Sequence, residues 1–193
     1  GRRDRRAEHV GTGVEVTELP SSIPTIVSTP TRVTASLLEP RSQHSEQLLR
    51  TIGVASVVFT ALAFDPADIA VPLDASGFLV PRDAGLSITA VSWSSVKWEH
   101  LSDGPVILRA SLGHAADDSP IDWNDDEVLA RIRADLTTTM GISAPAIEHR
   151  ITRYRDAFPQ YAVGHLDLID ELETTLAADA SNLVVCGMAH RGV

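Results

Sequence analysis

The chain has 193 residues, 44% of them hydrophobic, and a formal net charge of −10 at pH 7. This length and apolar content suffice for one substantial core, which excludes a disordered chain. The acidic excess argues against a nucleic-acid surface, because neutralising phosphates requires clustered cations. A soluble protein that binds a small molecule or another protein fits better.

Metal-binding and membrane-spanning patterns are not found in this sequence. Cys186 is the single cysteine, which excludes an intrachain disulfide and a cysteine-based metal site and favours a reducing cytoplasm. The acidic runs at 117–118 and 125–127 fit a solvated loop and a helix N-terminus better than a cation site. No apolar run approaches the ~20 residues that span a bilayer. The chain begins at Gly1 rather than methionine, and we interpret it as a piece of a longer protein.

The first third of the chain predicts a tail, a strand and two helices. Residues 1–6 form a charge run typical of a frayed terminus. Residues 25–28 predict a short buried strand, and Thr29-Pro30 after it is a helix-start signal with Thr29 as N-cap. A second helix is expected over 46–51.

The middle of the chain predicts strands. Residues 54–64 are β-branched or apolar on both faces, as in a central strand covered on each side. Strands over 86–93 and 106–112 are expected to be antiparallel to one another, and 77–81 is a shorter extended piece.

The last third predicts a long helix over 123–140, with Asp122 as its N-cap and Gly141 as its stop. Three elements are expected after it: an edge strand over 147–154, a helix over 166–176 and a strand over 183–186. Together the elements predict an α+β fold, with a mixed or antiparallel sheet, packed helices, and two short strands near 26 and 184 in a separate layer.

The residues alone specify no reaction, since the chain has no GxGxxG, P-loop or nucleophile elbow. His165, after Gly164 at a helix start, is a candidate acid or base, with a capping or packing role as the alternative. Lys97, Arg82 and Arg109 are candidate partners for the carboxylates of an anionic ligand, with surface solubility as the alternative.

Several segments resemble one family of flavoproteins. Residues 26–38, IVSTPTRVTASLL, resemble the strand–turn–helix by which flavin amine-oxidase-like chains re-enter the FAD domain. Residues 153–165 resemble the more specific PQY..GH segment of protoporphyrinogen and coproporphyrinogen oxidases. Residues 183–193 resemble the terminal glycine turn of that family. Residues 77–81 and 93–98 resemble its substrate domain, especially in actinobacterial members.

This resemblance runs from about Ile23 to the last residue and implies the C-terminal part of an FAD-dependent porphyrinogen oxidase of actinobacterial type. It implies a remnant of the FAD-binding domain over 1–38, a substrate-binding domain over 39–155 and a truncated return to the FAD-binding domain over 156–193. The FAD-binding part would be Rossmann-like and incomplete.

The implied reaction oxidises coproporphyrinogen III to coproporphyrin III, or protoporphyrinogen IX to protoporphyrin IX, in haem biosynthesis. The implied cofactor is FAD, which passes electrons to molecular oxygen, so a catalytic triad is not required. A downstream ferrochelatase or a second copy of the chain is the implied protein partner. The alternative is a catalytically inactive fragment that retains a porphyrin-binding or structural domain. A desaturase-like relative is disfavoured by Pro159-Gln160-Tyr161.

The resemblance assigns site residues by position. Six residues would contact the flavin: Val16, Tyr154, Gly187, Arg191, Gly192 and Val193. Val16 would lie beside the adenine, and Tyr154 stands where the family usually has tryptophan. Lys97 and Arg109 are expected to bind substrate, and no residue is assigned a catalytic role. Because the N-terminal βαβ unit with its glycine fingerprint is absent, the isolated chain is expected to bind flavin weakly or not at all and to show no turnover.

Overall fold

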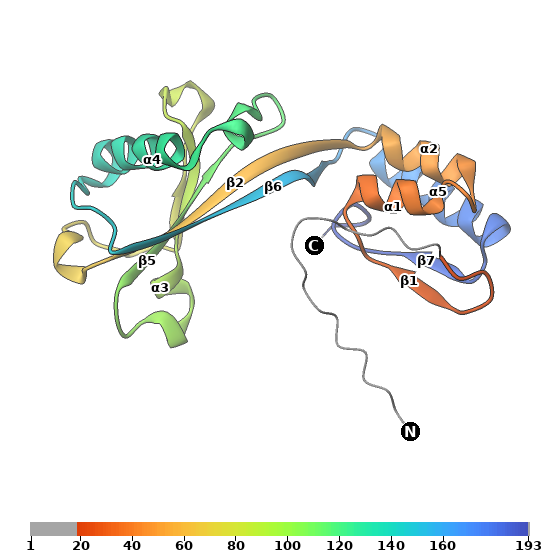
Figure 1. The fold of residues 1–193 in the computed structure, drawn as a ribbon, viewed down its shortest axis with the longest axis horizontal. Helices are drawn as coiled ribbons and strands as arrows, with labels where there is room; N and C mark the ends of the chain where they lie inside the picture. The colour runs from red at the N-terminus through yellow and green to blue at the C-terminus, as the bar shows by residue number, and fades with distance from the viewer. Residues whose placement is uncertain (1–18, 193) are drawn as a thin grey trace.

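The computed structural model describes residues 19–192 and divides them into two lobes joined by two long strands (Figure 1). The sheet lobe contains β2 (Gly53–Phe64), β3 (Gly77–Leu79), β4 (Ile88–Trp93), α3 (Ser94–Lys97), β5 (Val106–Leu112), α4 (Asp125–Met140) and β6 (Glu148–Gln160). The helical lobe contains β1 (Thr25–Val27), α1 (Thr31–Leu38), α2 (Gln43–Thr51), α5 (His165–Asp179) and β7 (Leu183–Val185). Four 3-10 turns also occur in this part of the chain: η1 (Pro66–Asp68), η2 (Arg82–Ala84), η3 (Glu99–Leu101) and η4 (Ser119–Asp122). The expected α+β class, with two short strands in a separate layer, is confirmed. The tail expected over 1–6 lies outside the described residues.

The sheet lobe has one core, between the sheet and α4. The antiparallel sheet has the order β3-β4-β5-β2-β6, so β2 is flanked by β5 and β6. Side chains at alternate positions of the central strands pack against one stripe of α4: Val58, Leu62, Phe64, Leu108, Leu112, Val128, Ile132 and Leu136. Burial of such side chains contributes ~1.5–3 kcal/mol each.

The opposite face of the sheet, which we call the open sheet face, carries no long helix (Figure 1). The sequence predicts a central strand covered on both sides, and this expectation is wrong. The side chains of Val57, Phe59, Ala61 and Ala63 alternate with the buried ones and stay half-exposed. Apolar residues on this second face of β2 therefore do not mark a second core.

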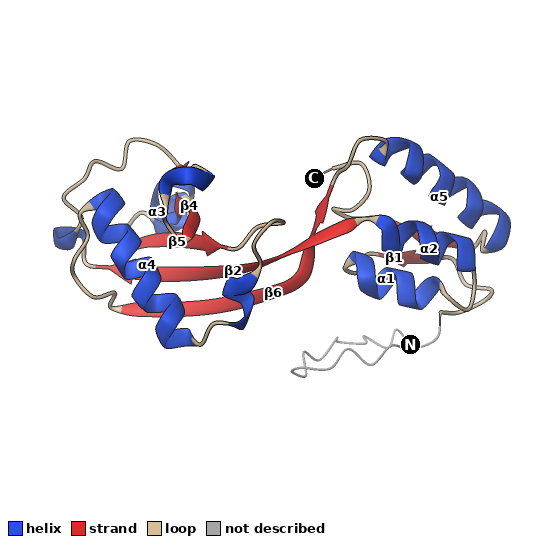
Figure 2. Ribbon diagram, turned by 90° about the horizontal axis from the view of Figure 1, so that it is seen from above, coloured by secondary structure: helices blue, strands red, loops and turns tan. Residues whose placement is uncertain are grey.

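β2 and β6 extend beyond the other strands and form the connection between the lobes (Figure 2). A bulge interrupts their pairing. Val57 lies opposite Tyr154, but Ala55 lies opposite Phe158, so β6 has more residues than β2 between these two pairs. The bulge contains Asp156 in the left-handed region, with φ 51°, and its amide donates to the Ser56 hydroxyl at 3.1 Å. The strand expected over 147–154 therefore continues through the bulge to Gln160.

The helical lobe is assembled from both ends of the described chain. β1 and β7 pair in parallel, with Thr25 opposite Leu183 and Val27 opposite Val185. Its core gathers apolar side chains of three helices and both strands: Val27, Leu38, Leu49, Ile52, Ile169, Leu172, Leu176 and Leu183. Because α2 contributes to this core, the chain leaves the helical lobe at Gly53 and returns to it after Gln160. Both positions lie later in the chain than the expected domain boundaries at residues 39 and 156.

Two helix starts differ from the sequence-based expectation. Asn124, not Asp122, caps α4, and its side-chain oxygen accepts from the Glu127 amide at 2.9 Å. Asp122 ends turn η4 and pairs with Arg155 at 2.6 Å. Pro30 occupies the cap position of α1 without a side-chain hydrogen bond to the helix.

None of the helices in residues 19–192 combines the length and apolarity needed to cross a membrane. Over the same residues, no group of three or more histidine, cysteine, aspartate or glutamate side chains is arranged to hold a metal ion.

A buried carboxylate fixes α4 to the start of β4. Asp135 is only 7% exposed, and one of its oxygens accepts from the amides of Ser87 at 2.8 Å and Ile88 at 2.9 Å. We predict that Asp135→Ala lowers the free energy of unfolding by about 1–3 kcal/mol, because two amides lose their charged acceptor. Urea denaturation measures this loss. Thr138→Ala, on the exposed side of the same helix, should change the value by less than about 0.5 kcal/mol, and equal effects of the two substitutions would contradict the assignment.

Candidate functional site

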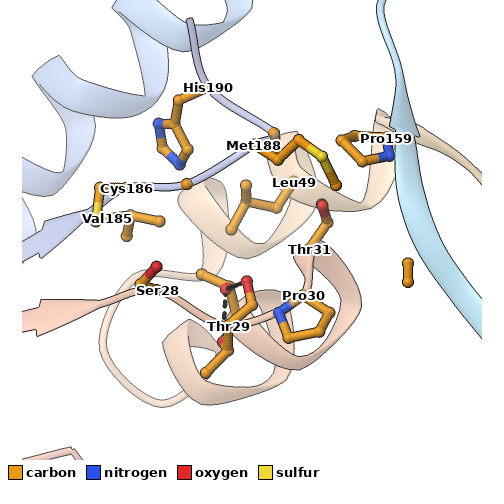
Figure 3. A pocket seen from close by; sticks show the side chains of 14 residues that line it. Ser28, Thr29, Pro30, Thr31, Leu49, Pro159, Val185, Cys186, Met188 and His190 are labelled. Carbon is orange, nitrogen blue, oxygen red and sulfur yellow. Dashed lines mark hydrogen bonds between the residues drawn. The ribbon is translucent and has the colours of Figure 1, made fainter. Parts of the chain in front are cut away.

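A cavity of about 190 Å³ lies where the two lobes meet, and we call it the glycine-turn pocket. Its walls come from the segments after β1 and β7 and from the end of β6 (Figure 3). Residues 28–31 form one wall and residues 185–190 the opposite one, while Leu49 and Pro159 are further lining residues. Since parallel strands bind ligands beyond their carboxyl ends, this position suits a ligand of an α/β layer.

The glycine turn depends on glycine at position 187, where the backbone has a positive φ. Gly187 has φ +124°, a conformation that side-chain-bearing residues rarely adopt, and the Ser28 hydroxyl lies 3.6 Å from where a Cβ would stand. The amide of Cys186 donates to the Val27 carbonyl at 3.0 Å, and the amide of His190 donates to the Gly187 carbonyl at 3.1 Å. The chain can therefore turn sharply while its backbone lines the pocket.

Two side chains, one just before α5 and one at its first residue, hold this turn in place. The Tyr161 hydroxyl donates to the Met188 carbonyl, and the His165 Nε2 donates to the His190 carbonyl at 2.7 Å. The rings of Tyr161 and His165 lie 4.5 Å apart. His165 thus has the packing and positioning role that was the alternative to acid–base chemistry.

The terminal residues assigned to the flavin have different environments. Arg191 pairs with Asp170 at 2.7 Å and Glu173 at 2.8 Å on α5, and the hydrogen bond to Glu173 is the largest cause that raises its pKa. Gly192 is exposed with φ +106°. Val16 and Val193 lie outside the described residues.

A cation and three aromatic rings gather on the open sheet face. The Arg109 guanidinium lies 4.7 Å from the centre of the Phe59 ring, where the cation meets the negative face of the ring. Phe59 contacts Tyr154 edge-on at 5.6 Å and Phe158 at 5.7 Å. Tyr154 is 42% exposed, so the cluster keeps an accessible aromatic surface.

The structure brings some of the predicted site residues together and separates others. Tyr154 and Arg109 both contact the ring of Phe59. The sequence did not single out Phe59, although it alternates in β2 with the buried residues and so lies on the half-exposed face. Gly187 lies in the glycine-turn pocket, which Tyr154 does not line. Lys97 is an exposed residue at the end of α3, a helix that contacts β5, the strand of Arg109.

β6 connects the two regions. Phe158 belongs to the aromatic cluster, while its neighbours Ala157 and Pro159 line the glycine-turn pocket. The bulge at Asp156 sets this arrangement, because it carries the strand from the open sheet face to the pocket within a few residues. Because side chains alternate along a strand, Phe158 and its two neighbours project to opposite sides of β6, so the aromatic cluster and the glycine-turn pocket flank the same short stretch of this strand.

The glycine-turn pocket fits one edge of a flavin. Its lining combines the hydroxyls of Ser28, Thr29 and Thr31 with backbone groups of the turn, and its apolar wall includes Leu49 and Val185. Sites that enclose a drug-sized ligand usually measure ~300–1,000 Å³, so a cavity of about 190 Å³ cannot hold a whole dinucleotide.

The chain belongs to the flavin containing amine oxidoreductase family, whose model matches residues 25–193. It is 31% identical over 171 residues to the coproporphyrinogen III oxidase of Bacillus subtilis, covering 87% of this chain and 36% of that protein. It is 33% identical over 151 residues to the coproporphyrinogen III oxidase of Mycobacterium bovis, covering 78% of this chain and 33% of that protein. The chain thus spans about a third of the length of these curated relatives.

Two solved structures share the fold of this chain. A crystal structure named as a protoporphyrinogen oxidase, from Exiguobacterium sp. 255-15, superposes with a TM-score of 0.75 at 27% identity, covering 87% of this chain and 36% of that one. Reduced UDP-galactopyranose mutase superposes with a TM-score of 0.60 at 11% identity, covering 84% of this chain and 35% of that one, and shows similarity of fold alone.

His190 gives the glycine turn a pH dependence. Burial lowers its pKa from the ordinary value of 6.5, against the opposing attraction of Glu173, while His165 and Arg191 lower it further. Because the unfolded chain then binds this proton more readily, the free energy of unfolding should fall as the pH drops below about 6.5. We predict a shallower fall between pH 7.5 and 5.5 in His190→Gln, measured by urea denaturation at each pH. His100→Gln, at an exposed position, should keep the wild-type slope, and an unchanged slope in His190→Gln would rule out this role.

Proposed function

We propose that this chain supplies the substrate-binding sheet and part of the flavin site of an enzyme that oxidises coproporphyrinogen III to coproporphyrin III in haem biosynthesis. The observation that carries the proposal is the run of β6 from the aromatic cluster on the open sheet face into the glycine-turn pocket. The names of the curated relatives support the same reaction.

The sheet face suits a tetrapyrrole. A porphyrinogen has a broad apolar ring system with carboxylates at its rim. Phe59, Tyr154 and Phe158 offer ring edges and faces to the macrocycle, and Arg109 offers a guanidinium that can bind a carboxylate through two parallel hydrogen bonds. These residues would bind and orient the substrate beside the pocket.

FAD, when bound, would supply the redox chemistry, with molecular oxygen as the final electron acceptor. In this proposal Gly187 and the backbone of the turn approach the isoalloxazine edge, and Tyr154 lies on the substrate side of it. Arg191, Gly192 and Val193 would continue toward the pyrophosphate, and Val16 would lie beside the adenine. Lys97 would approach the substrate from α3.

The cellular context is part of the same proposal. The lone Cys186, exposed on the surface, suits a reducing compartment such as the cytoplasm. Protoporphyrinogen IX is the second candidate substrate. A ferrochelatase that takes the porphyrin product, or a second copy of the chain, would be the partner.

One observation favours a second function. Since the glycine-turn pocket holds only an edge of a flavin, the chain by itself would be a tetrapyrrole-binding module without oxidase activity. Flavin binding and porphyrin binding separate these alternatives.

We predict that the purified 193-residue chain retains little FAD and shows no porphyrinogen oxidation, because its pocket encloses too little of the dinucleotide. Flavin absorbance after gel filtration in excess FAD measures retention. Stoichiometric FAD that survives filtration would contradict the prediction and favour the oxidase over the binding module.

We predict that coproporphyrin III binds the chain saturably and that Arg109→Ala weakens this binding by about 1–3 kcal/mol, through loss of a charged hydrogen bond. Titration of the Soret band measures both affinities. Arg133→Ala, on α4 across the sheet, is the matched control and should bind like wild type. A wild-type chain that produces no saturable Soret change would overturn the proposed function.

A further inference from the structure

We propose that Arg150 binds a second substrate carboxylate, so that Arg109 and Arg150 together hold a tetrapyrrole across the open sheet face. We call the two residues the arginine pair. The inference rests on the proposed function and names the part of the substrate that this face recognises.

Strand register places the arginine pair on one face. Ala61 of β2 lies opposite Arg109 on β5 and opposite Arg150 on β6. Directly paired residues project from the same side of a sheet, so both arginines flank Ala61 on the open sheet face. Two strand spacings separate their Cα atoms by about 10 Å.

A shallow apolar hollow of about 170 Å³ lies between the two strands that carry the pair. Ala61 and Ala63 form its floor, Ile107 of β5 lines it, and Glu148 and Arg150 of β6 line it from the other strand. The alanine side chains are small, so the hollow follows from the sequence of β2. A flat ring can rest over such a floor.

The arginine pair places two cationic side chains on either side of β2, whose residues on this face are apolar. Over residues 19–192 neither arginine makes an ion pair, whereas Arg153 and Arg155 are both paired with aspartates near the start of α4. Glu148 also lies on this face, opposite Ala63, and it forms no ion pair with Arg150 within the described residues. In a chain with a net charge of −10, two unpaired guanidinium groups on one sheet face favour an anionic occupant.

The two guanidinium groups point to different places along β2. Arg109 lies over Phe59, toward Tyr154, while Arg150 lines the hollow above Ala61 and Ala63. One small anion between them would use only part of this arrangement. A wide ligand with carboxylates at separate points of its rim uses both, and coproporphyrinogen and coproporphyrin have this chemistry.

Arg150→Gln tests the proposal in the complete chain. Titration of the Soret band with coproporphyrin III should show affinity weakened roughly 10-fold, the change that a charged hydrogen bond of about 1.4 kcal/mol produces. Arg150→Lys, which keeps the charge and loses the bidentate geometry, should fall between wild type and Arg150→Gln. With coproporphyrin tetramethyl ester, in matched detergent, wild type and Arg150→Gln should bind alike, because the ester lacks the charged groups.

Arg133→Gln is the control, because Arg133 borders an apolar hollow on the α4 side of the sheet. Weaker coproporphyrin binding in Arg133→Gln, with Arg150→Gln unchanged, would place the ligand on that side and overturn the inference. Wild-type affinity in Arg150→Gln, with circular dichroism confirming the fold, would remove Arg150 from the site and leave the proposed function standing. Failure of the wild-type chain to bind coproporphyrin III would overturn both.

Discussion

The pairing of β2 with β6 is the constraint on which the rest of the structure depends. These two strands form one edge of the sheet and the position next to it, connect the lobes, and carry the aromatic rings of the candidate site. Their bulge preserves the alternation of side chains, so that Phe158 remains on the same face as Tyr154 although the register has shifted. On the other side of β2, Gly113 after β5 approaches the same stretch closely, since a Cβ there would lie 2.7 Å from the Ser56 carbonyl oxygen.

The two faces of the sheet differ in burial. The face toward α4 buries the aliphatic side chains that supply the hydrophobic driving force, and Asp135 fixes the helix to β4. The open sheet face contributes little to that core, so its residues are available for a ligand. Phe59 shows the distinction, since its ring contacts a cation and two aromatic neighbours instead of the helix.

Much of the fold follows from local sequence signals, whereas the site depends on pairing between distant segments. The strands at 106–112 and 183–186 and the helix stop at Gly141 were predictable from apolar patterning and a glycine in the left-handed region. The exposure of the second face of β2 was not predictable, because an apolar residue on a half-exposed sheet face looks the same in sequence as one in a core. The family resemblance predicted Tyr154 and Gly187 as site residues, but Phe59 and Phe158 become neighbours only through the register of two strands far apart in the chain.

The helical lobe is continuous in space but discontinuous along the chain. Gly53 and Gln160 lie directly opposite one another in the register of β2 and β6. The chain therefore enters and leaves the sheet lobe at two adjacent positions. A short hairpin between these two residues would join the two parts of the helical lobe directly. Recombination at these two positions would therefore replace the sheet lobe by a module of different shape, while the helical lobe around Gly187 keeps its own packing.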